Sequence, residues 1–257
     1  YIPYLGEALM AVLLVVFQRA CALSIGRSEW YALSFIAPVL MLVYMNDIYV
    51  MLCYLIALII AVLLCALYRR HPGLLWAGIA TMLGYWLIGP AIFVFTVFAA
   101  LKERNWYSLI LIAAAVLTVY ASKWTYLQQY PWKTLAFGVN YYRHALVVPP
   151  MQLLIAAAAV LVPAFSDLLP KPKTYVNLAL GLLLAAAGTF GCWLDYEKDV
   201  VEIIAYDQLV RQEDWDGLLE RAEKYQPNSE LASVSMNLAL FMSGRGNDLP
   251  RFKQFGT

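Results

Sequence analysis

Long stretches without a charged residue limit what this chain can fold into. Residues 48–68 read "IYVMLCYLIALIIAVLLCALY" and carry no charge over a full 21 positions. A helix of about 20 apolar residues is long enough to cross a hydrocarbon core of about 30 Å. The same criterion selects further windows at 5–25, 31–46, 106–122, 149–165 and 174–194. The sequence therefore predicts an all-α protein built on a bundle of transmembrane helices.

The segment 74–101, "LLWAGIATMLGYWLIGPAIFVFTVFAAL", has two interpretations. Its 28 residues contain Gly89 and Pro90 in the middle. Proline removes a helical hydrogen bond, and a Gly-Pro pair favours a turn. The segment is either one long kinked helix or a hairpin of two short helices. The whole chain is accordingly predicted to have seven or eight membrane segments.

Charged residues are distributed very unevenly along the chain. Residues 1–195 hold 17 charged side chains (11 Lys/Arg and 6 Asp/Glu), whereas the last 62 residues hold 18 (7 and 11). Soluble domains have about 25% charged residues. We therefore expect a transmembrane domain at 1–195 and a soluble helical segment at 196–257. The net charge of +1 and the lack of a basic stretch with interleaved aromatics exclude nucleic acid as an expected partner.

Residues 123–149 separate two predicted spans and are rich in aromatic and basic side chains. Such residues prefer the headgroup region, so this segment is expected to lie at the membrane interface. If 74–101 is a hairpin, Lys and Arg divide eight to three between the two faces; if it crosses once, they divide seven to four. Because cytoplasmic loops are enriched in Lys and Arg, the hairpin is favoured, and it places the C-terminal segment outside the cytoplasm. The hairpin arrangement puts Arg19, Arg27, Arg69, Arg70, Lys102, Arg104, Lys171 and Lys173 on one face and Lys123, Lys133 and Arg143 on the other.

The C-terminal 62 residues have the pattern of amphipathic helices. Apolar residues at helical spacing predict a helix over 200–210. Asp214 is expected to cap a second helix, which carries Trp215 and ends before Pro227, and Ser229 to begin a third, which ends near Gly244. Short helices of this kind, with aromatic and small residues at packing positions, resemble tetratricopeptide-type repeats. Trp215 and Tyr225 are the predicted partner-binding residues.

The stretches "YALSFIAPVLMLVYMNDIYVMLCYLIALIIAVLL" (31–64) and "YDQLVRQEDWDGLLERAEKYQPNSELASVSMNLAL" (206–240) resemble a family of multi-pass inner-membrane proteins of unknown function from Bacteroidota. The resemblance implies further transmembrane sequence upstream and more helical repeats downstream, so the chain is expected to be part of a longer protein. The layout is also similar to polyprenyl-phosphate-dependent sugar transferases of the multi-pass kind. Those use an acidic residue in an external loop, and residues 1–195 contain no Asp-x-Asp or Glu-x-Asp pair.

Few residues of the membrane domain are candidates for chemistry. Arg143 and His144 in "NYYRH", with Lys133, could hold a lipid phosphate, or they could simply anchor the chain at the interface. Asp47 in "YMNDIY" is either a turn residue or an acid facing an external cavity. His144 and Asp47 are therefore the catalytic candidates. The four cysteines have no metal-ligand spacing, so no metal and no cofactor is expected. The small-residue run "AAAGTFG" indicates close helix packing.

Two functions remain open at this point. The first is a membrane scaffold or assembly subunit of the bacterial inner membrane, with membrane lipids around it. Its C-terminal helices would lie in the periplasm and bind a protein partner. The second is a membrane-embedded enzyme that uses a lipid-phosphate-linked donor. A transporter is a weaker third possibility, since the spans lack paired intramembrane charges.

Overall fold

The computed structural model describes residues 5–26, 28–47, 50–103, 106–138, 149–194 and 198–252. Within these ranges every regular element is helical and no strand occurs, which confirms the all-α expectation. The chain divides into two compact units, Tyr1–Asp195 and Tyr196–Thr257. The division falls at the position where the charge density of the sequence changes. We call them the membrane unit and the C-terminal unit and describe each separately.

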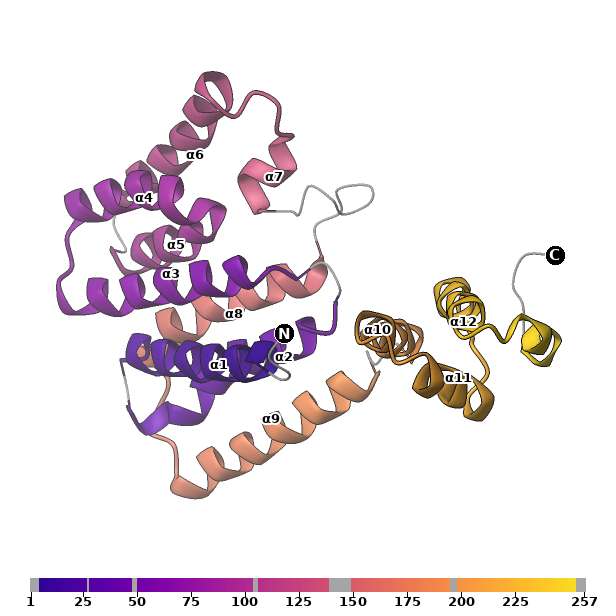
Figure 1. Cartoon of the computed structure of the whole chain (residues 1–257). Coiled ribbons are helices and arrows are strands. Elements are labelled where there is room, and N and C mark those ends of the chain that lie inside the picture. Colours follow the sequence, from indigo (N-terminus) through magenta and orange to yellow (C-terminus); the bar gives the residue numbers. More distant parts are fainter. Residues whose placement is uncertain are drawn as a thin grey trace. The chain divides into compact units, whose positions relative to one another are not determined.

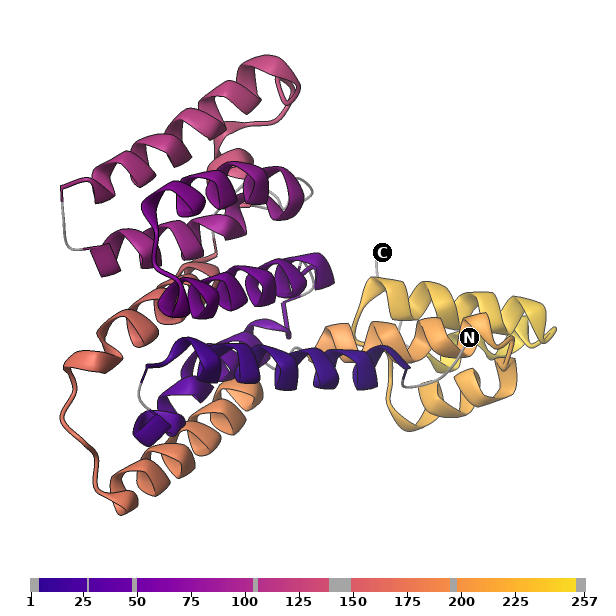
Figure 2. The same cartoon turned by 90° about the vertical axis from the view of Figure 1, so that its left-hand side faces the viewer.

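The membrane unit is a layered stack of helices. In Figures 1 and 2 the ribbons follow one another from α6 at the top, through α4, α5 and α3, to α1, α2 and α9 at the bottom. Helix α3 packs against α1 and α5, α8 against α2 and α5, and α9 against η1 and α2. The elements are α1 (Leu5–Ser24), η1 (Ser28–Phe35), α2 (Ile36–Tyr44), α3 (Leu52–Arg70), α4 (Leu74–Ile88), η2 (Gly89–Ala91), α5 (Ile92–Glu103), α6 (Ser108–Thr125), α7 (Trp132–Phe137), α8 (Pro150–Phe165), η4 (Ser166–Leu168) and α9 (Thr174–Leu194).

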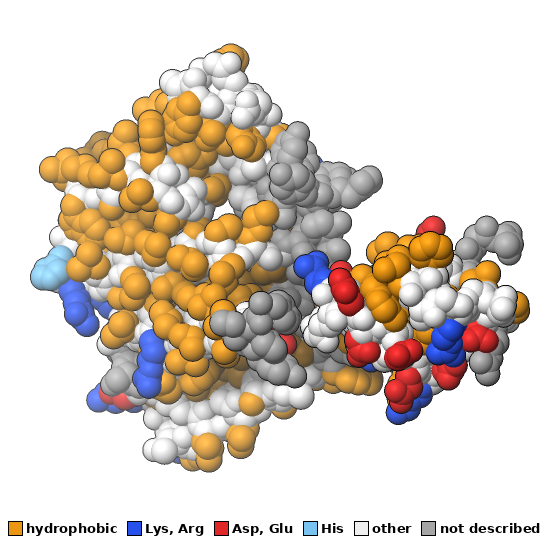
Figure 3. All heavy atoms as spheres, viewed as in Figure 1, with side chains coloured by type: hydrophobic (Ala, Val, Ile, Leu, Met, Phe, Trp, Pro, Cys, Tyr) orange, Lys and Arg blue, Asp and Glu red, His pale blue; other side chains and the backbone are white. Residues whose placement is uncertain are grey.

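Six helical segments among the described residues are long and apolar enough to cross a membrane. The predicted total of seven or eight is not confirmed. The difference lies in the window 31–46, where the chain forms the short elements η1 and α2 instead of one long helix. It also lies in Leu74–Glu103, which is counted here as one segment although it contains both α4 and α5. Large apolar side chains cover the outside of the unit, as the predominance of hydrophobic atoms in Figure 3 illustrates. This outside suits lipid better than water.

The segment 74–101 folds back on itself. The hydroxyl oxygens of Thr81 in α4 and Thr96 in α5 are 2.9 Å apart, whereas 15 residues of straight helix would separate them by roughly 22 Å. The reversal occurs at Gly89, whose φ of 64° and ψ of −150° are accessible almost only to glycine. Of the two interpretations of this segment, the hairpin is therefore the correct one.

The two ends of the membrane unit differ in charge. Helices α3, α5 and α8 finish together at one end, beside Arg69, Lys102 and Asp167; we call it the clamp end. The Gly89 turn, the loop after α2 and helix α7 lie at the other, which we call the hairpin end. Among the described residues, the clamp end carries Arg19, Arg69, Arg70, Lys102, Lys171 and Lys173, and the hairpin end carries Lys123 and Lys133.

Close packing joins α9 to α2. A Cβ atom added to Gly188 would lie 3.0 Å from Val39, and one added to Gly191 would lie 2.7 Å from Val43. The small-residue run at the end of α9 therefore allows the two helices to approach each other, as its composition indicated.

The C-terminal unit is a small helical bundle of α10 (Lys198–Arg211), α11 (Trp215–Lys224), α12 (Glu230–Met242) and η5 (Gly246–Arg251). Both predicted helix caps are present: the Asp214 carboxylate accepts from Gly217 N, and the Ser229 hydroxyl accepts from Ala232 N. Helix α12 ends just before Gly244, which has a φ of 71°. The buried core consists of Tyr206, Leu218, Leu219, Ala222, Ala232, Met236, Ala239, Leu240 and Phe252. Helices α11 and α12 form a hairpin, but nothing confirms that it is a tetratricopeptide-type repeat.

Candidate functional site

Three apolar cavities surround the hairpin in the membrane unit. Cavity 1, of about 430 Å³, lies between α3 and the Gly89 turn and is lined by residues such as Ile56 and Leu87. Cavity 2, of about 380 Å³, lies between α5, α7 and α8, next to Val97 and Leu153. Cavity 3, of about 430 Å³, lies between α5, α6 and α7. These volumes are within the range of about 300–1,000 Å³ that is usual for ligand pockets.

The cavities share walls and contain few polar groups. Cavities 1 and 2 are both bordered by Tyr54, Pro90, Ala91 and Gln152. The Tyr54 hydroxyl donates to the backbone oxygen of Gln152 at 3.4 Å, and the Gln152 Nε2 donates to the backbone oxygen of Phe137 at 2.6 Å. These polar atoms are thus bonded within the protein. What the cavities offer a ligand is mainly hydrocarbon surface.

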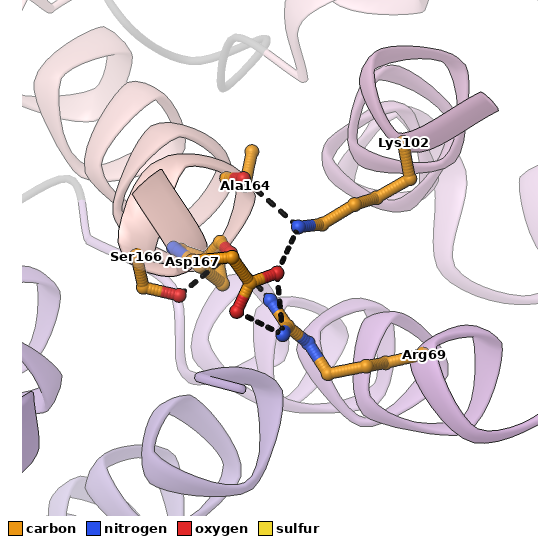
Figure 4. A network of polar contacts seen from close by, with 6 residues as sticks. Arg69, Lys102, Ala164, Ser166 and Asp167 are labelled. Atoms are coloured by element: carbon orange, nitrogen blue, oxygen red, sulfur yellow. Dashed lines mark hydrogen bonds and ion pairs between the residues drawn. The ribbon is translucent and has the colours of Figure 1, made fainter. Parts of the chain in front are cut away.

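A cluster of charged side chains, which we call the clamp, connects three helices at the clamp end of the membrane unit (Figure 4). Arg69 Nη1 of α3 donates to both Asp167 carboxylate oxygens at 2.8 and 2.9 Å, and Lys102 Nζ of α5 donates to one of them at 2.7 Å. The two cations also donate to the carbonyl oxygens of Pro163 and Ala164 at the end of α8. The last carbonyls of a helix lack partners within it and attract cations. The clamp therefore both pairs charges and caps α8.

The clamp is continued by a group of aromatic side chains. The ring of Tyr68 lies 5.4 Å from that of Trp76 and 6.0 Å from that of Phe95, measured between centroids. The Tyr68 hydroxyl donates to the Glu103 carboxylate. Since the ion pairs and rings all connect the ends of neighbouring helices, we assign this region a structural role in closing the clamp end.

Of the sequence-predicted site residues in the membrane unit, the structure describes Asp47 and Lys133. Asp47 lies in the turn after α2, where its N–H donates to Tyr44 O at 3.0 Å and its own carbonyl accepts from Val50 N at 3.1 Å. Lys133 is exposed on α7. Arg143 and His144 lie outside the described residues. The turn accounts for the position of Asp47. A catalytic role stays a prediction for Asp47 and His144. A phosphate-binding role stays a prediction for Arg143, His144 and Lys133.

In the C-terminal unit the two predicted partner-binding residues are placed differently. Trp215 packs against the core, whereas Tyr225 is 60% exposed. The hydroxyl of Tyr206 donates to the backbone oxygen of Tyr225 at 3.4 Å, and the Tyr206 ring is buried. Burial and the nearby Glu202 carboxylate raise the pKa of Tyr206 to about 12, and Arg221 acts in the opposite direction. The role of Trp215 and Tyr225 in binding a partner stays a prediction.

A second surface of this unit lies on α12, where the sequence predicted apolar residues at helical spacing but not their exposure. The outward face of α12 carries five large apolar side chains, which we call the α12 stripe: Leu231, Val234, Leu238, Phe241 and Met242. Each is at least 40% exposed, and Phe241 reaches 80%. The opposite face of the same helix, with Met236 and Leu240, is fully buried. In Figure 3 hydrophobic side chains gather along the upper side of this unit, and most charged ones lie on its lower side.

Sequence reasoning also missed Tyr54, Gln152 and Asp167. The sequence held a signal for two of these three: Gln152 interrupts the apolar run 149–165, and Asp167 is an acid directly after that run. No group of three or more His, Cys, Asp or Glu side chains is close enough to hold a metal ion in the part of the chain that the structure describes.

Comparison with curated proteins and with solved structures finds no match to this chain. One family model does match, and it covers residues 1–257, that is, both the membrane unit and the C-terminal unit. Its description is "Family of unknown function (DUF6057)". The chain therefore belongs to this family of unknown function.

Proposed function

We propose that this protein is an integral membrane scaffold: residues 1–195 anchor it, and the C-terminal unit binds a helical segment of a protein partner through the α12 stripe. The observation that carries the proposal is that α12 is apolar on both faces. Its inner face is used by the core of the unit, while Leu238 and Phe241 on the outer face are exposed. A helix that is hydrophobic all round is normally buried, and exposed apolar patches mark interaction sites.

The charge of the C-terminal unit favours a protein over a lipid surface as the occupant of the stripe. Residues 196–257 hold 11 acidic and 7 basic side chains, and anionic membranes attract basic segments instead. The expected partner is an amphipathic helix with an apolar face that is flanked by Lys or Arg. Such a helix would pack along the stripe as neighbouring helices do in helical repeats.

The proposal is tested by site-specific photo-crosslinking in native membranes. The full chain carries a photoreactive phenylalanine analogue at position 241, and a second version carries it at the exposed Glu220 of α11. We expect one discrete crosslinked species for position 241 and none for position 220. Sequencing of the crosslinked peptide should identify an amphipathic, basic helix.

A pair of matched variants makes the test specific. Leu238→Asp places a charge in the stripe, and Leu249→Asp makes the same change at a similarly exposed position in η5. Leu238→Asp should abolish the crosslink from position 241, because a charge buried in an apolar interface without a partner is strongly unfavourable. Loss of the crosslink in both variants, or in neither, would contradict the proposal.

We further propose that the protein lies in the bacterial inner membrane with its C-terminal unit in the periplasm. The six described Lys and Arg residues of the clamp end, against two at the hairpin end, support a cytoplasmic clamp end. Helix α9 runs from the clamp end to the hairpin end, where Asn46 donates to the carbonyl of Cys192. The chain would then leave the membrane on the periplasmic side.

The alternative enzyme, which would use a lipid-phosphate-linked donor, has less support. Neither Asp47 nor Lys133 lines any of the three cavities, so none of these cavities brings the two candidates together. We therefore do not propose a catalytic activity.

A further inference from the structure

We propose that cavity 2 is a binding site for one hydrocarbon chain of a membrane phospholipid, whose phosphate lies beside Lys133. The site is separate from the α12 stripe. It belongs to the membrane unit alone and does not depend on the proposed scaffold function.

Cavity 2 opens toward the hydrocarbon of the bilayer. Its walls include Val97 of α5 and Leu153 and Leu161 of α8, which are 42%, 47% and 47% exposed. Helix α8 belongs to a segment long enough to span the membrane, Pro150–Leu168. An apolar wall without neighbours loses its dispersion contacts. In a bilayer, a lipid hydrocarbon chain can fill the cavity and restore these dispersion contacts.

Water is a poor occupant of this cavity. A buried water needs roughly two to four polar partners. The polar side chains in the wall are Tyr54 and Gln152, and both already donate to backbone carbonyls. The rest of the wall is alanine and larger apolar side chains, so an alkyl chain suits it better.

The position of Lys133 identifies the class of lipid. Lys133 is three and four residues before Ala136 and Phe137, which line cavity 2. Residues at this spacing lie on the same side of a helix. Lys133 is exposed, and no described carboxylate forms an ion pair with it. By contrast, the ammonium of Lys123 is occupied by the carbonyls of Gln128 and Tyr130. A free ammonium beside an apolar cavity suits a lipid with an anionic phosphate.

The test is photolabelling of the full chain in vesicles that contain phosphatidylglycerol with a diazirine on one acyl chain. After irradiation and digestion, we expect labels to concentrate on the α8 residues between Leu153 and Leu161. The exposed face of α9 around Leu178 and Leu182 measures labelling by bulk lipid. Equal labelling per residue on α8 and α9 would overturn the proposal.

Replacing either of two alanines by phenylalanine distinguishes an effect on cavity 2 from a general effect of a larger side chain. Ala157→Phe fills cavity 2, whereas Ala186→Phe makes the same change on an exposed position of α9 that lines none of the cavities. Ala157→Phe should lower labelling of α8 roughly tenfold by occupying the space of the chain. Ala186→Phe should leave it unchanged. Circular dichroism and gel filtration in detergent establish that both variants fold, and an unchanged label in a folded Ala157→Phe variant would refute the site.

A separate pair of lipids tests whether the phosphate of the headgroup binds Lys133. Lys133→Gln should lower labelling by phosphatidylglycerol about fivefold, which corresponds to roughly 1 kcal/mol for one lost lysine–phosphate interaction. Labelling by a diacylglycerol with the same diazirine chain should not change, since this lipid has no phosphate. If Lys133→Gln affects both lipids equally, the phosphate is not bound at Lys133, and this part of the proposal is wrong.

Discussion

Single polar side chains in the membrane unit mostly bind backbone carbonyls or one another. Thr81, Thr96 and Thr118 each donate to the carbonyl four residues earlier. Arg69 and Lys102 donate to the end of α8 and to Asp167. Leaving a polar group without a partner in an apolar environment costs roughly 2–7 kcal/mol. These bonds within the protein therefore explain how polar residues are tolerated in an apolar helical unit.

Asp167→Asn should destabilise the membrane unit. The substitution removes the only carboxylate of the clamp and leaves Arg69 and Lys102 without their shared anion. Hydrogen bonds to charged groups contribute about 1.5–3 kcal/mol, and because the Asp167 side chain is 42% exposed, we expect about 1–2 kcal/mol. Thermal unfolding in detergent measures the change. Glu29→Gln, which breaks the more exposed Glu29–Lys171 pair, should change stability by less than about 0.5 kcal/mol.

Ser229→Ala should loosen α12 specifically. The Ser229 hydroxyl is the acceptor for the N–H of Ala232 at the start of that helix, and loss of such a cap costs about 1 kcal/mol. Hydrogen exchange followed by mass spectrometry should show faster exchange in peptides from Glu230–Met242. Ser235→Ala serves as the control because the Ser235 hydroxyl binds the Leu231 carbonyl within the helix and caps nothing. Equal effects of the two substitutions would argue against the cap.

At the scale of elements, the hairpin of α4 and α5 positions the cavities. With 15 and 12 residues, its arms are about 22 and 18 Å long, shorter than a hydrocarbon core of about 30 Å. The turn at Gly89 and Pro90 thus ends beside Tyr54 and Gln152, where cavities 1 and 2 meet.

Gly89→Ala should therefore destabilise the hairpin. Gly89 has φ 64° and ψ −150°, and a residue with a side chain held in such a region costs about 1–3 kcal/mol. The midpoint of thermal unfolding in detergent should fall. Gly181→Ala is the matched control: Gly181 lies within helix α9 and an added Cβ has nothing within 4 Å. A loss of stability in the control as large as in Gly89→Ala would contradict the explanation.

At the scale of the whole molecule, the proposed orientation of the membrane unit rests on the distribution of basic residues. Lys171 follows α8 at the clamp end, next to Glu29, and Lys133 is on α7 at the hairpin end. If the clamp end is cytoplasmic, as Lys and Arg enrichment favours, these two positions are on opposite sides of the membrane.

Cysteine labelling tests this orientation. In a variant without the four native cysteines, Lys133→Cys should react with a membrane-impermeant maleimide added to the periplasmic side. Lys171→Cys should react only after the membrane is permeabilised. Labelling of both positions from the same side would contradict the arrangement of the helices, and a reversed pattern would contradict the periplasmic location of the C-terminal unit.

The sequence by itself determined the features that depend on local pattern. Runs of apolar residues predicted the membrane helices, because backbone groups in lipid must bond within their own segment. The change in charge density after Asp195 coincides with the division between the two units. The caps at Asp214 and Ser229 were predicted correctly because capping depends on only three or four neighbouring residues.

Tertiary structure alone decided what depends on residues far apart in the chain. The sequence around Gly89 allowed either a kinked helix or a hairpin, and the contact between Thr81 and Thr96 shows that it is a hairpin. Arg69 and Asp167 are 98 residues apart, and no local pattern relates them. The cavities and the exposure of the α12 stripe likewise follow from how helices pack. Periodicity shows which residues share a helix face, but only packing shows which of those faces is covered.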